Sequence, residues 1–191
     1  RLYGRERMKR LLFLILPLLC TLGLRAETID LGEFGRLSFT VDASAWKVAS
    51  ANMNDGTFEV MISPRNGANA YAGFTISLRP GLAATSRERL QAALVADSRE
   101  EATGSVERRV DPKEFAVKSG FGYSADFTDR TLVGRATKKG DFKAQTKVML
   151  ALAEMIGVSG SVASGGFDDP VHQQLLGIFR SMEVLPAAAK K

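Results

Sequence analysis

The chain has 191 residues, of which 45% are hydrophobic and 25% charged, and its formal net charge is +5. It contains one histidine and one cysteine, which excludes a zinc site built from several His and Cys ligands. A chain of about this size buries roughly 70% of its unfolded surface, enough for one core without disulfides. We therefore expect a single domain.

The first distinctive segment is apolar and short. Residues 11–24 carry no charge and follow a basic stretch. As a helix this run would measure about 21 Å, less than the about 30 Å of a hydrocarbon core. Its length, its basic flank and the small Ala26 at its end predict a secretory signal peptide, residues 1–26, cleaved after Ala26. Two alternatives are lipidation at Cys20 and an uncleaved membrane anchor. Leu19 argues against lipidation, because an acylated cysteine needs a small residue before it, and the short length of the run argues against an anchor.

Removal of this segment changes the charge of the protein. It takes away six basic residues and one acidic residue, so 26 basic and 21 acidic residues become 20 of each. The expected mature chain is neutral and free of cysteine, and it needs no disulfide in an oxidising compartment. The positive charge of the full chain is therefore no argument for nucleic-acid binding. We expect a periplasmic or secreted protein without a stable membrane anchor.

Alternating apolar and polar residues predict strands in the first part of the mature chain. They cover residues 36–41, resume at Trp46, and recur over 58–62 and 74–78. Asn54-Asp55-Gly56 predicts a hairpin turn, because Asp-Gly readily adopts positive φ. A lone tryptophan beside such strands normally fills the core, so we expect Trp46 to be buried.

A helix is predicted next. Thr85 and Glu88 have the spacing of a capping box, in which each side chain satisfies a free backbone donor of the other. The helix is expected to run from Thr85 to about Glu101. Its apolar face, built on Leu90, Ala93 and Leu94, is thin, so we expect one side on the sheet and the other in water.

The second half of the chain again reads mainly as strands. Apolar residues keep odd positions from Phe115 to Phe127, which predicts one long strand or two joined at the Gly120/Gly122 bend. Residues 138–141 are expected as a turn between strands over 131–137 and 142–152. Residues 149–162 fit helix or strand, and the glycines at 157 and 160 favour strand.

The last predicted element is an amphipathic helix. Asp169 is a natural N-cap and Pro170 suits the first helical position. Apolar residues then recur at helical spacing, at Val171, Leu175, Phe179 and Met182. Residues 186–191 are expected to form a disordered tail.

Two segments carry a resemblance to a known family. Phe39-Thr-Val41 followed by Trp46, and the closing phrase Ile178-Phe-Arg-Ser-Met-Glu-Val184, together with the order of elements resemble the Mog1/PsbP-like superfamily over residues 29–185. The usual Pro-x-x-Trp turn appears here as Ala43-Ser-Ala-Trp46. The resemblance implies a single α+β domain, residues 27–185, with an antiparallel sheet between helices (an α/β/α sandwich).

The same resemblance bears on function. Members of the superfamily include a protein that binds a small GTPase and proteins that support the oxygen-evolving side of photosystem II. The shared absence of an enzymatic centre implies a non-enzymatic binding or accessory role. For this chain we expect an unknown protein of the cell envelope as the partner.

The residues themselves offer few routes to catalysis. His172 is the only possible histidine base, and its place in the first turn of the last helix favours a structural role in capping. Gly120-Phe-Gly122-Tyr-Ser-Ala125 has the letters of a dinucleotide fingerprint, but the strand pattern continues through it where a helix should begin. Asp168 and Asp169 are too few oxygens for a calcium site. We predict no catalytic residue, no cofactor and no metal.

Positive charge gathers in one predicted hairpin. Such a run is usually a solvated face, and otherwise a docking surface for an acidic protein or anionic lipid headgroups. The candidate partner-binding residues are Arg135, Lys138, Lys139, Lys143 and Lys147, with Arg130 nearby. The first alternative is a small-molecule or lipid carrier with a cleft between sheet and helix, which an apolar cavity would support. The second is an unrecognised enzyme, which a polar cluster around His172 in a cleft would support.

Overall fold

The computed structural model describes residues 23–53, 56–78 and 86–187. Most of the predicted signal peptide, the Asn54-Asp55 part of the predicted hairpin turn, Thr85 of the predicted capping box and the end of the predicted tail lie outside the described residues.

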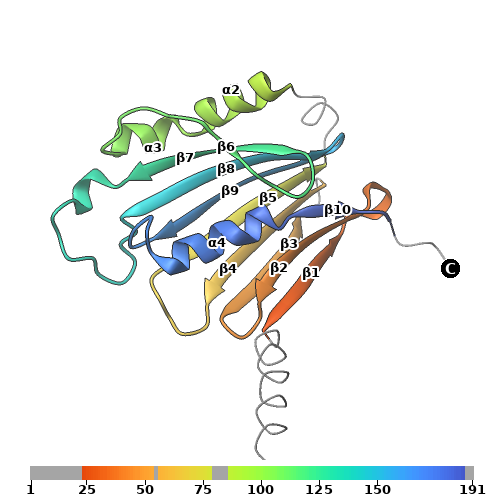
Figure 1. Ribbon diagram of the computed structural model, residues 1–191, viewed down its shortest axis with the longest axis horizontal. Coiled ribbons are helices and arrows are strands. Elements are labelled where there is room, and N and C mark those ends of the chain that lie inside the picture. Colours follow the sequence, from red (N-terminus) through yellow and green to blue (C-terminus); the bar gives the residue numbers. More distant parts are fainter. Residues whose placement is uncertain (1–22, 54–55, 79–85, 188–191) are drawn as a thin grey trace, which may run out of the picture.

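The described chain is built on two antiparallel sheets (Figure 1). The large sheet has seven strands in the order β3-β4-β5-β9-β8-β7-β6, and the small sheet has the order β1-β2-β10. The strands of the large sheet are β3 (Trp46–Met53), β4 (Thr57–Pro64), β5 (Tyr71–Leu78), β6 (Lys113–Phe115), β7 (Phe121–Thr128), β8 (Ala144–Ala153) and β9 (Ile156–Ser164). Those of the small sheet are β1 (Leu24–Asp30), β2 (Arg36–Asp42) and β10 (Glu183–Leu185). Two short 3-10 turns are η2 (Gly32–Phe34) and η3 (Arg130–Leu132).

One face of the large sheet carries helix α4 (Pro170–Arg180), which crosses in front of the strands in Figure 1. Leu175 and Phe179 stand four residues apart, so both turn inward. Phe179 meets the ring of Phe74 from the sheet edge-on at 5.5 Å, and Phe74 meets Phe39 from β2 at 5.6 Å. Trp46 belongs to this main core and is 4% exposed, which confirms its predicted burial. The small sheet and α4 therefore share one hydrophobic core with the large sheet.

The opposite face of the large sheet, called the outer face here, is covered in part. Helix α2 (Arg87–Asp97) packs over β7 and β8, and α3 (Arg99–Gly104) adds Ala102 to the buried cluster beneath α2. Leu90 and Leu94 form a second core cluster there with Tyr123, Ala125 and Met149 of the sheet. With helices on both faces of an antiparallel sheet, the predicted α+β sandwich is confirmed.

The helical region on this face differs from the prediction in detail. The N-cap of α2 is Ser86, whose hydroxyl accepts a hydrogen bond from the amide of Arg89 at 3.4 Å. The helix ends at Asp97 rather than near Glu101, because the chain leaves helical geometry at Ser98. A second helix, α3, follows directly and contains Glu101.

The alternating run from Phe115 to Phe127 forms two strands, β6 and β7, paired as a hairpin. The connection ends at Gly120, whose φ is +73°. A Cβ at this position would overlap the carbonyl of Ala151, so the bend requires glycine. The ambiguous segment 149–162 is strand, as expected, in β8 and β9.

The strand predicted over residues 131–137 is wrong. β7 ends at Thr128, and the carboxylate of Asp129 accepts a hydrogen bond from the amide of Thr131 at 2.7 Å, which starts the 3-10 turn η3. Gly134 then adopts a φ of +74°. The chain from 133 to 143 therefore crosses the end of the sheet as a loop, and the predicted cationic hairpin does not form.

Strand β1 begins at Leu24, three residues before the expected mature start at Glu27. Leu24 lies opposite Asp42, and Ala26 lies opposite Thr40. A chain cleaved after Ala26 would keep only the Glu27–Asp30 part of β1. Within the described residues, none of the helices is long and apolar enough to cross a membrane.

Candidate functional site

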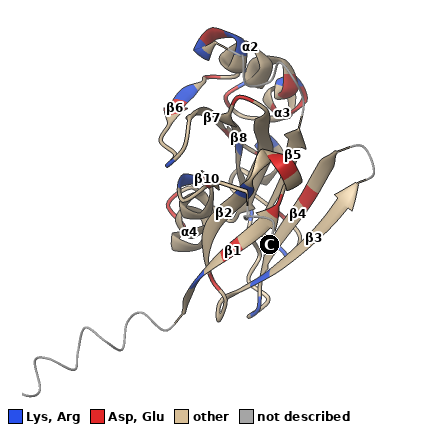
Figure 2. Ribbon diagram, turned by 90° about the vertical axis from the view of Figure 1, so that its right-hand side faces the viewer, with Lys and Arg blue, Asp and Glu red and all other residues tan. Residues whose placement is uncertain are grey.

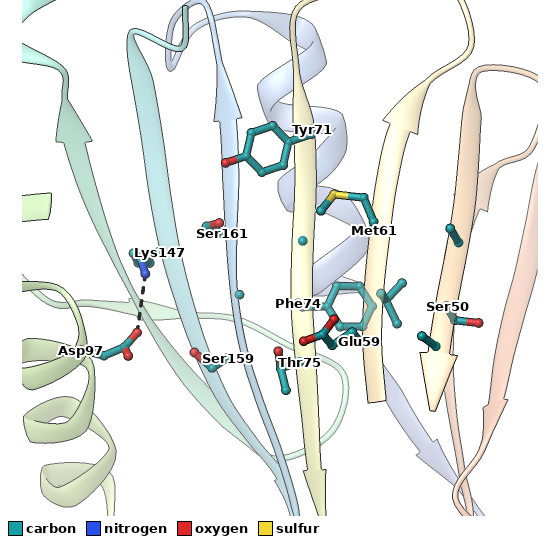
Figure 3. A pocket seen from close by; sticks show the side chains of 15 residues that line it. Ser50, Glu59, Met61, Tyr71, Phe74, Thr75, Asp97, Lys147, Ser159 and Ser161 are labelled. Atoms are coloured by element: carbon teal, nitrogen blue, oxygen red, sulfur yellow. Dashed lines mark ion pairs between the residues drawn. The ribbon is translucent and has the colours of Figure 1, made fainter. Parts of the chain in front are cut away.

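Where α2 and α3 leave the outer face open, the sheet forms a trough of about 600 Å³ over β3, β4, β5 and β9 (Figure 3). We call it the outer trough. Its floor is made of small side chains and its margins of larger ones. The residues that define it include Ala49, Glu59, Met61, Gly73, Ser159 and Ser161.

Strand alternation explains this lining. On β4 and β5, Val60, Ile62 and Phe74 point into the core, so Glu59 and Met61 point outward. The strand register aligns the outward residues in rows across the sheet. One row is Ala49, Met61, Gly73 and Ser161, and the next is Ala51, Glu59, Thr75 and Ser159. None of these residues was predicted as a site from the sequence, although small and polar residues at alternate strand positions are a signal for an open sheet face.

The wall of the trough on the α2 side is an ionic cluster. Lys147 of β8 lies 2.8 Å from the carboxylate of Glu101 and 3.7 Å from that of Asp97. Its side chain is only 19% exposed. Lys147 therefore lies apart from the other predicted partner-binding cations, because strand alternation points it at the outer face where two helices supply carboxylates.

The remaining predicted cations lie together on the loop between β7 and β8, which we call the cationic loop (residues 133–143). Arg135, Lys138 and Lys139 are exposed, and Lys143 is half-buried. Arg130 is exposed just before the loop.

The cationic loop is held against the rim of the outer trough. The side-chain amide of Asn69 donates to the carbonyl of Asp141 at 2.6 Å and to that of Lys138 at 3.2 Å, and its oxygen accepts from the amide of Gly140 at 2.9 Å. Phe142 then packs edge-on against Tyr71 at 4.9 Å. Because Tyr71 also lines the trough, trough and loop form one continuous surface.

His172 lies elsewhere, on the core side of the large sheet. It does not cap α4, since the carboxylate of Asp169 does so by accepting from the amide of Val171 at 2.9 Å. The imidazole is fully buried between two hydroxyls. Its Nε2 lies 2.9 Å from the Thr146 oxygen, and its Nδ1 lies 2.8 Å from the Ser164 oxygen. His172 is the third residue of α4 and lies on the side of the helix that packs against the sheet.

A chain of hydrogen bonds runs outward from the ring. Burial lowers the pKa of His172 and outweighs the opposite effect of the carboxylates of Asp126 and Asp169. In the neutral ring, Nε2–H donates to Thr146, and the Thr146 hydroxyl donates to Asp126 at 2.7 Å. The other oxygen of Asp126 pairs with the ammonium of Lys113 at 2.9 Å. In this tautomer Nδ1 accepts, and the single proton of the Ser164 hydroxyl is shared between Nδ1 at 2.8 Å and the carbonyl of Gly166 at 2.9 Å.

This polar cluster borders a cleft of about 390 Å³. Its two groups with the character of a nucleophile and a base, Ser164 and His172, are both 0% exposed. Thr146 stands between the histidine and Asp126, so the carboxylate does not contact the ring as it would in a catalytic triad. The geometry is that of a buried hydrogen-bond network between α4, β8 and β9.

A further cleft of about 460 Å³ lies between β2 and α4. Apolar side chains dominate its walls, among them Val41, Trp46 and Ile178. Leu24, which lies at its mouth, is 67% exposed and falls within the predicted signal peptide.

No protein-family model matches the chain, and no curated protein matches it. Among solved structures, it is similar to the solution structure of cyanobacterial PsbP (CyanoP) from Synechocystis sp. PCC 6803, with a TM-score of 0.54 over 85% of this chain and 93% of that one. The chain has a PsbP-like fold. Sequence identity to CyanoP is 9%, so the likeness shows the fold alone.

A second solved structure with some likeness is the apo form of the immunity protein TplEi of the type VI secretion system from Pseudomonas aeruginosa. It is 15% identical, with a TM-score of 0.41 over 82% of this chain. The match spans 47% of the TplEi chain. The similarity to CyanoP confirms the PsbP-like fold that two sequence segments and the order of elements predicted.

Proposed function

We propose that this PsbP-like domain is an exported, non-enzymatic binding protein of the cell envelope, and that it docks a segment of another protein in the outer trough. The observation that supports this most directly is the half of the outer face that α2 and α3 leave open, bordered by the cationic loop. One face of an antiparallel sheet is often solvated, but here the open part of the face forms a trough of about 600 Å³, and a concave surface of this size is a candidate interaction site.

The chemistry of the trough favours a polypeptide. Hydroxyls at Thr75, Ser159 and Ser161 offer hydrogen bonds on the floor, while Met61 offers an adaptable apolar contact and is 49% exposed. At the Tyr71 end, the lysines and arginine of the cationic loop would attract acidic side chains of the partner. We therefore expect an extended segment with carboxylates at the end nearest the cationic loop.

A small-molecule or lipid carrier is the second candidate. The outer trough has a mixed polar and apolar lining and opens to solvent, which suits an acyl chain poorly. The cleft between β2 and α4 suits it better, because its walls are mainly apolar. Trp46, the only tryptophan, lines that cleft, so its fluorescence would change if a fatty-acid probe entered.

The test is site-specific crosslinking in cells that produce the protein. A photoreactive amino acid replaces Met61 in the trough or, as a control, Ala92 on the exposed side of α2. We expect one crosslinked envelope protein with the probe at position 61 and none at 92. Filling the trough with Ser161→Phe should remove that product without unfolding the protein, because this side chain points away from the core.

Equal crosslinking at both positions, or a product that survives Ser161→Phe, would contradict docking in the trough. A shift in Trp46 fluorescence with a fatty-acid probe, in the absence of a trough crosslink, would favour the carrier instead.

A further inference from the structure

Strand β3 is an unprotected edge of the large sheet. It has eight residues and pairs with β4 without a bulge, from Trp46 opposite Pro64 to Met53 opposite Thr57. Residues 49–53 are all exposed. Natural sheets usually blunt such an edge with charged side chains, a proline, a bulge or a very short strand. β3 has one charged residue, Lys47, whereas the other edge strand, β6, is only three residues long.

The surroundings of this edge leave it accessible. In Figure 2 the β3–β4 hairpin projects at the margin of the molecule and is almost free of charged residues. The start of the strand is closed, because the side chain of Arg65 donates to the carbonyl of Trp46 at 3.1 Å. The backbone beyond it has no neighbouring strand on that side within the described residues. An edge of this length and composition is suited to strand addition.

We propose that β3 pairs with β3 of a second copy of this chain, antiparallel and about a two-fold axis at Ala49. A two-fold axis perpendicular to the sheet keeps the outer faces of both copies on the same side, so residues of the same face must lie opposite each other. With Ala49 opposite Ala49 of the second copy, Lys47 lies opposite Ala51 and Val48 lies opposite Ser50. The two lysines are not opposed, so the strand does not repel its own copy.

Charge complementarity supports this register. Within one copy Ala51 is paired with Glu59 on β4. The two-fold pairing therefore sets Lys47 of one copy, Ala51 of the other and Glu59 of the other in one row on the outer face. Strands lie about 4.8 Å apart, so Lys47 and Glu59 would be about 10 Å apart at Cα. A lysine and a glutamate span this distance across the small Ala51, and the symmetry makes the ion pair twice.

The central row of the interface is also self-complementary. It reads Met61, Ala49, Ala49 and Met61 across the two copies, since Ala49 is paired with Met61 within each. The side chain of Met61 lies over Gly73 on the β5 side, so the two small alanines leave the axis free of large side chains. The pairing joins the two outer troughs edge to edge, and it stands whether or not the trough docks a partner.

The test is sedimentation of the exported protein over concentrations from about micromolar to about millimolar, the range in which small interfaces associate. Wild type should form dimers that dissociate on dilution. Lys47→Glu and Glu59→Lys should each weaken self-association about tenfold or more, because each replaces two ion pairs with two repulsions. An equimolar mixture of the two variants should dimerise again, since the mixed dimer carries both ion pairs.

Two controls separate pairing from other effects. Arg109→Glu changes the net charge by the same amount as Lys47→Glu, but at an exposed position outside β3 and β4, and should leave the dimer unchanged. Ser50→Pro should abolish dimerisation by blocking the strand ladder, with urea unfolding used to confirm that the variant is folded. A wild-type protein that stays monomeric throughout, a dimer indifferent to both charge variants, or a mixture that does not recover association would overturn the proposal.

Discussion

At the scale of single residues, His172 is the clearest case of a feature whose role depends on its surroundings. In sequence it is the only histidine and therefore the only possible histidine base. In the structure it is fully buried and held by Thr146 and Ser164. Its hydrogen bonds tie α4 to β8 and β9, so its contribution is to the stability of the fold.

This burial predicts a pH dependence of stability. Because the pKa of His172 is lower in the folded state than the usual value of about 6.5, the unfolded chain binds a proton more readily. The stabilisation is complete above about pH 6.5 and is lost as the pH falls through the folded-state pKa. Urea unfolding from pH 7.5 down to pH 5 should show wild type losing stability over this window, and His172→Gln losing less.

The same variant also tests the enzyme alternative. His172→Gln should leave the trough crosslink and the biological activity nearly intact in folded protein. Loss of activity by this variant, with crosslinking and folding unchanged, would favour the hypothesis of an enzyme over that of a binding protein.

Trp46 supports a second prediction at this scale. It lies 4% exposed in the main core, where β3 leaves the turn that follows β2. Truncation of a buried aromatic side chain loses its transfer free energy and leaves a cavity, so Trp46→Ala should reduce the free energy of unfolding by about 3–5 kcal/mol. A loss below about 1 kcal/mol in urea melts would show that the site is far looser than the structure indicates.

At the scale of elements, the cationic loop is the segment in which the structure departs most from the sequence-based prediction. The predicted strand over 131–137 is absent, yet Arg135, Lys138, Lys139 and Lys143 remain close together. Asn69, in the loop between β4 and β5, and Tyr71 of β5 hold the cationic loop in place. The loop is therefore a defined charged surface beside the trough.

Charge reversal of this loop should weaken docking. Changing Lys138, Lys139 and Lys143 to Glu is expected to reduce the trough crosslink, and more at low salt than at high, because exposed charges are screened over about 8–10 Å at physiological ionic strength. A matched control reverses three exposed arginines around α3, at 99, 108 and 109. Equal loss with both triple variants would mean that net charge, rather than the loop, governs binding.

At the scale of the whole molecule, the expected processing site falls within an element of the fold. Cleavage after Ala26 would remove the first three residues of β1 and leave Thr40–Asp42 of β2 without their partners on that side. The apolar residues of β2 would stay packed on the main core, because Leu37, Phe39 and Val41 belong to it. The domain should therefore tolerate the shorter β1.

N-terminal sequencing of the exported protein tests this processing. We expect the mature chain to begin at Glu27. Full-length protein retained in the membrane fraction, or protein labelled by palmitate, would contradict it. A mature start at or before Leu24 would instead preserve the whole of β1.

Much of the fold is determined by local patterns. Alternation placed most strands of the large sheet, Asp169 and Pro170 marked the start of α4, and the phrase around Phe179 led to the PsbP-like fold. These signals are local because strand alternation, helix caps and the period of an amphipathic helix depend on near neighbours in the chain. The candidate cations of the loop were also visible in sequence.

Only the tertiary structure decided how the two faces of the large sheet are used. The order of the strands and the position of α2 over β7 and β8 leave β3, β4, β5 and β9 open. The same arrangement points Lys147 at Glu101 rather than at the loop, and buries His172 between Thr146 and Ser164. These contacts join residues up to 46 positions apart in sequence, and no local pattern determines which strand becomes an edge or which face a helix covers.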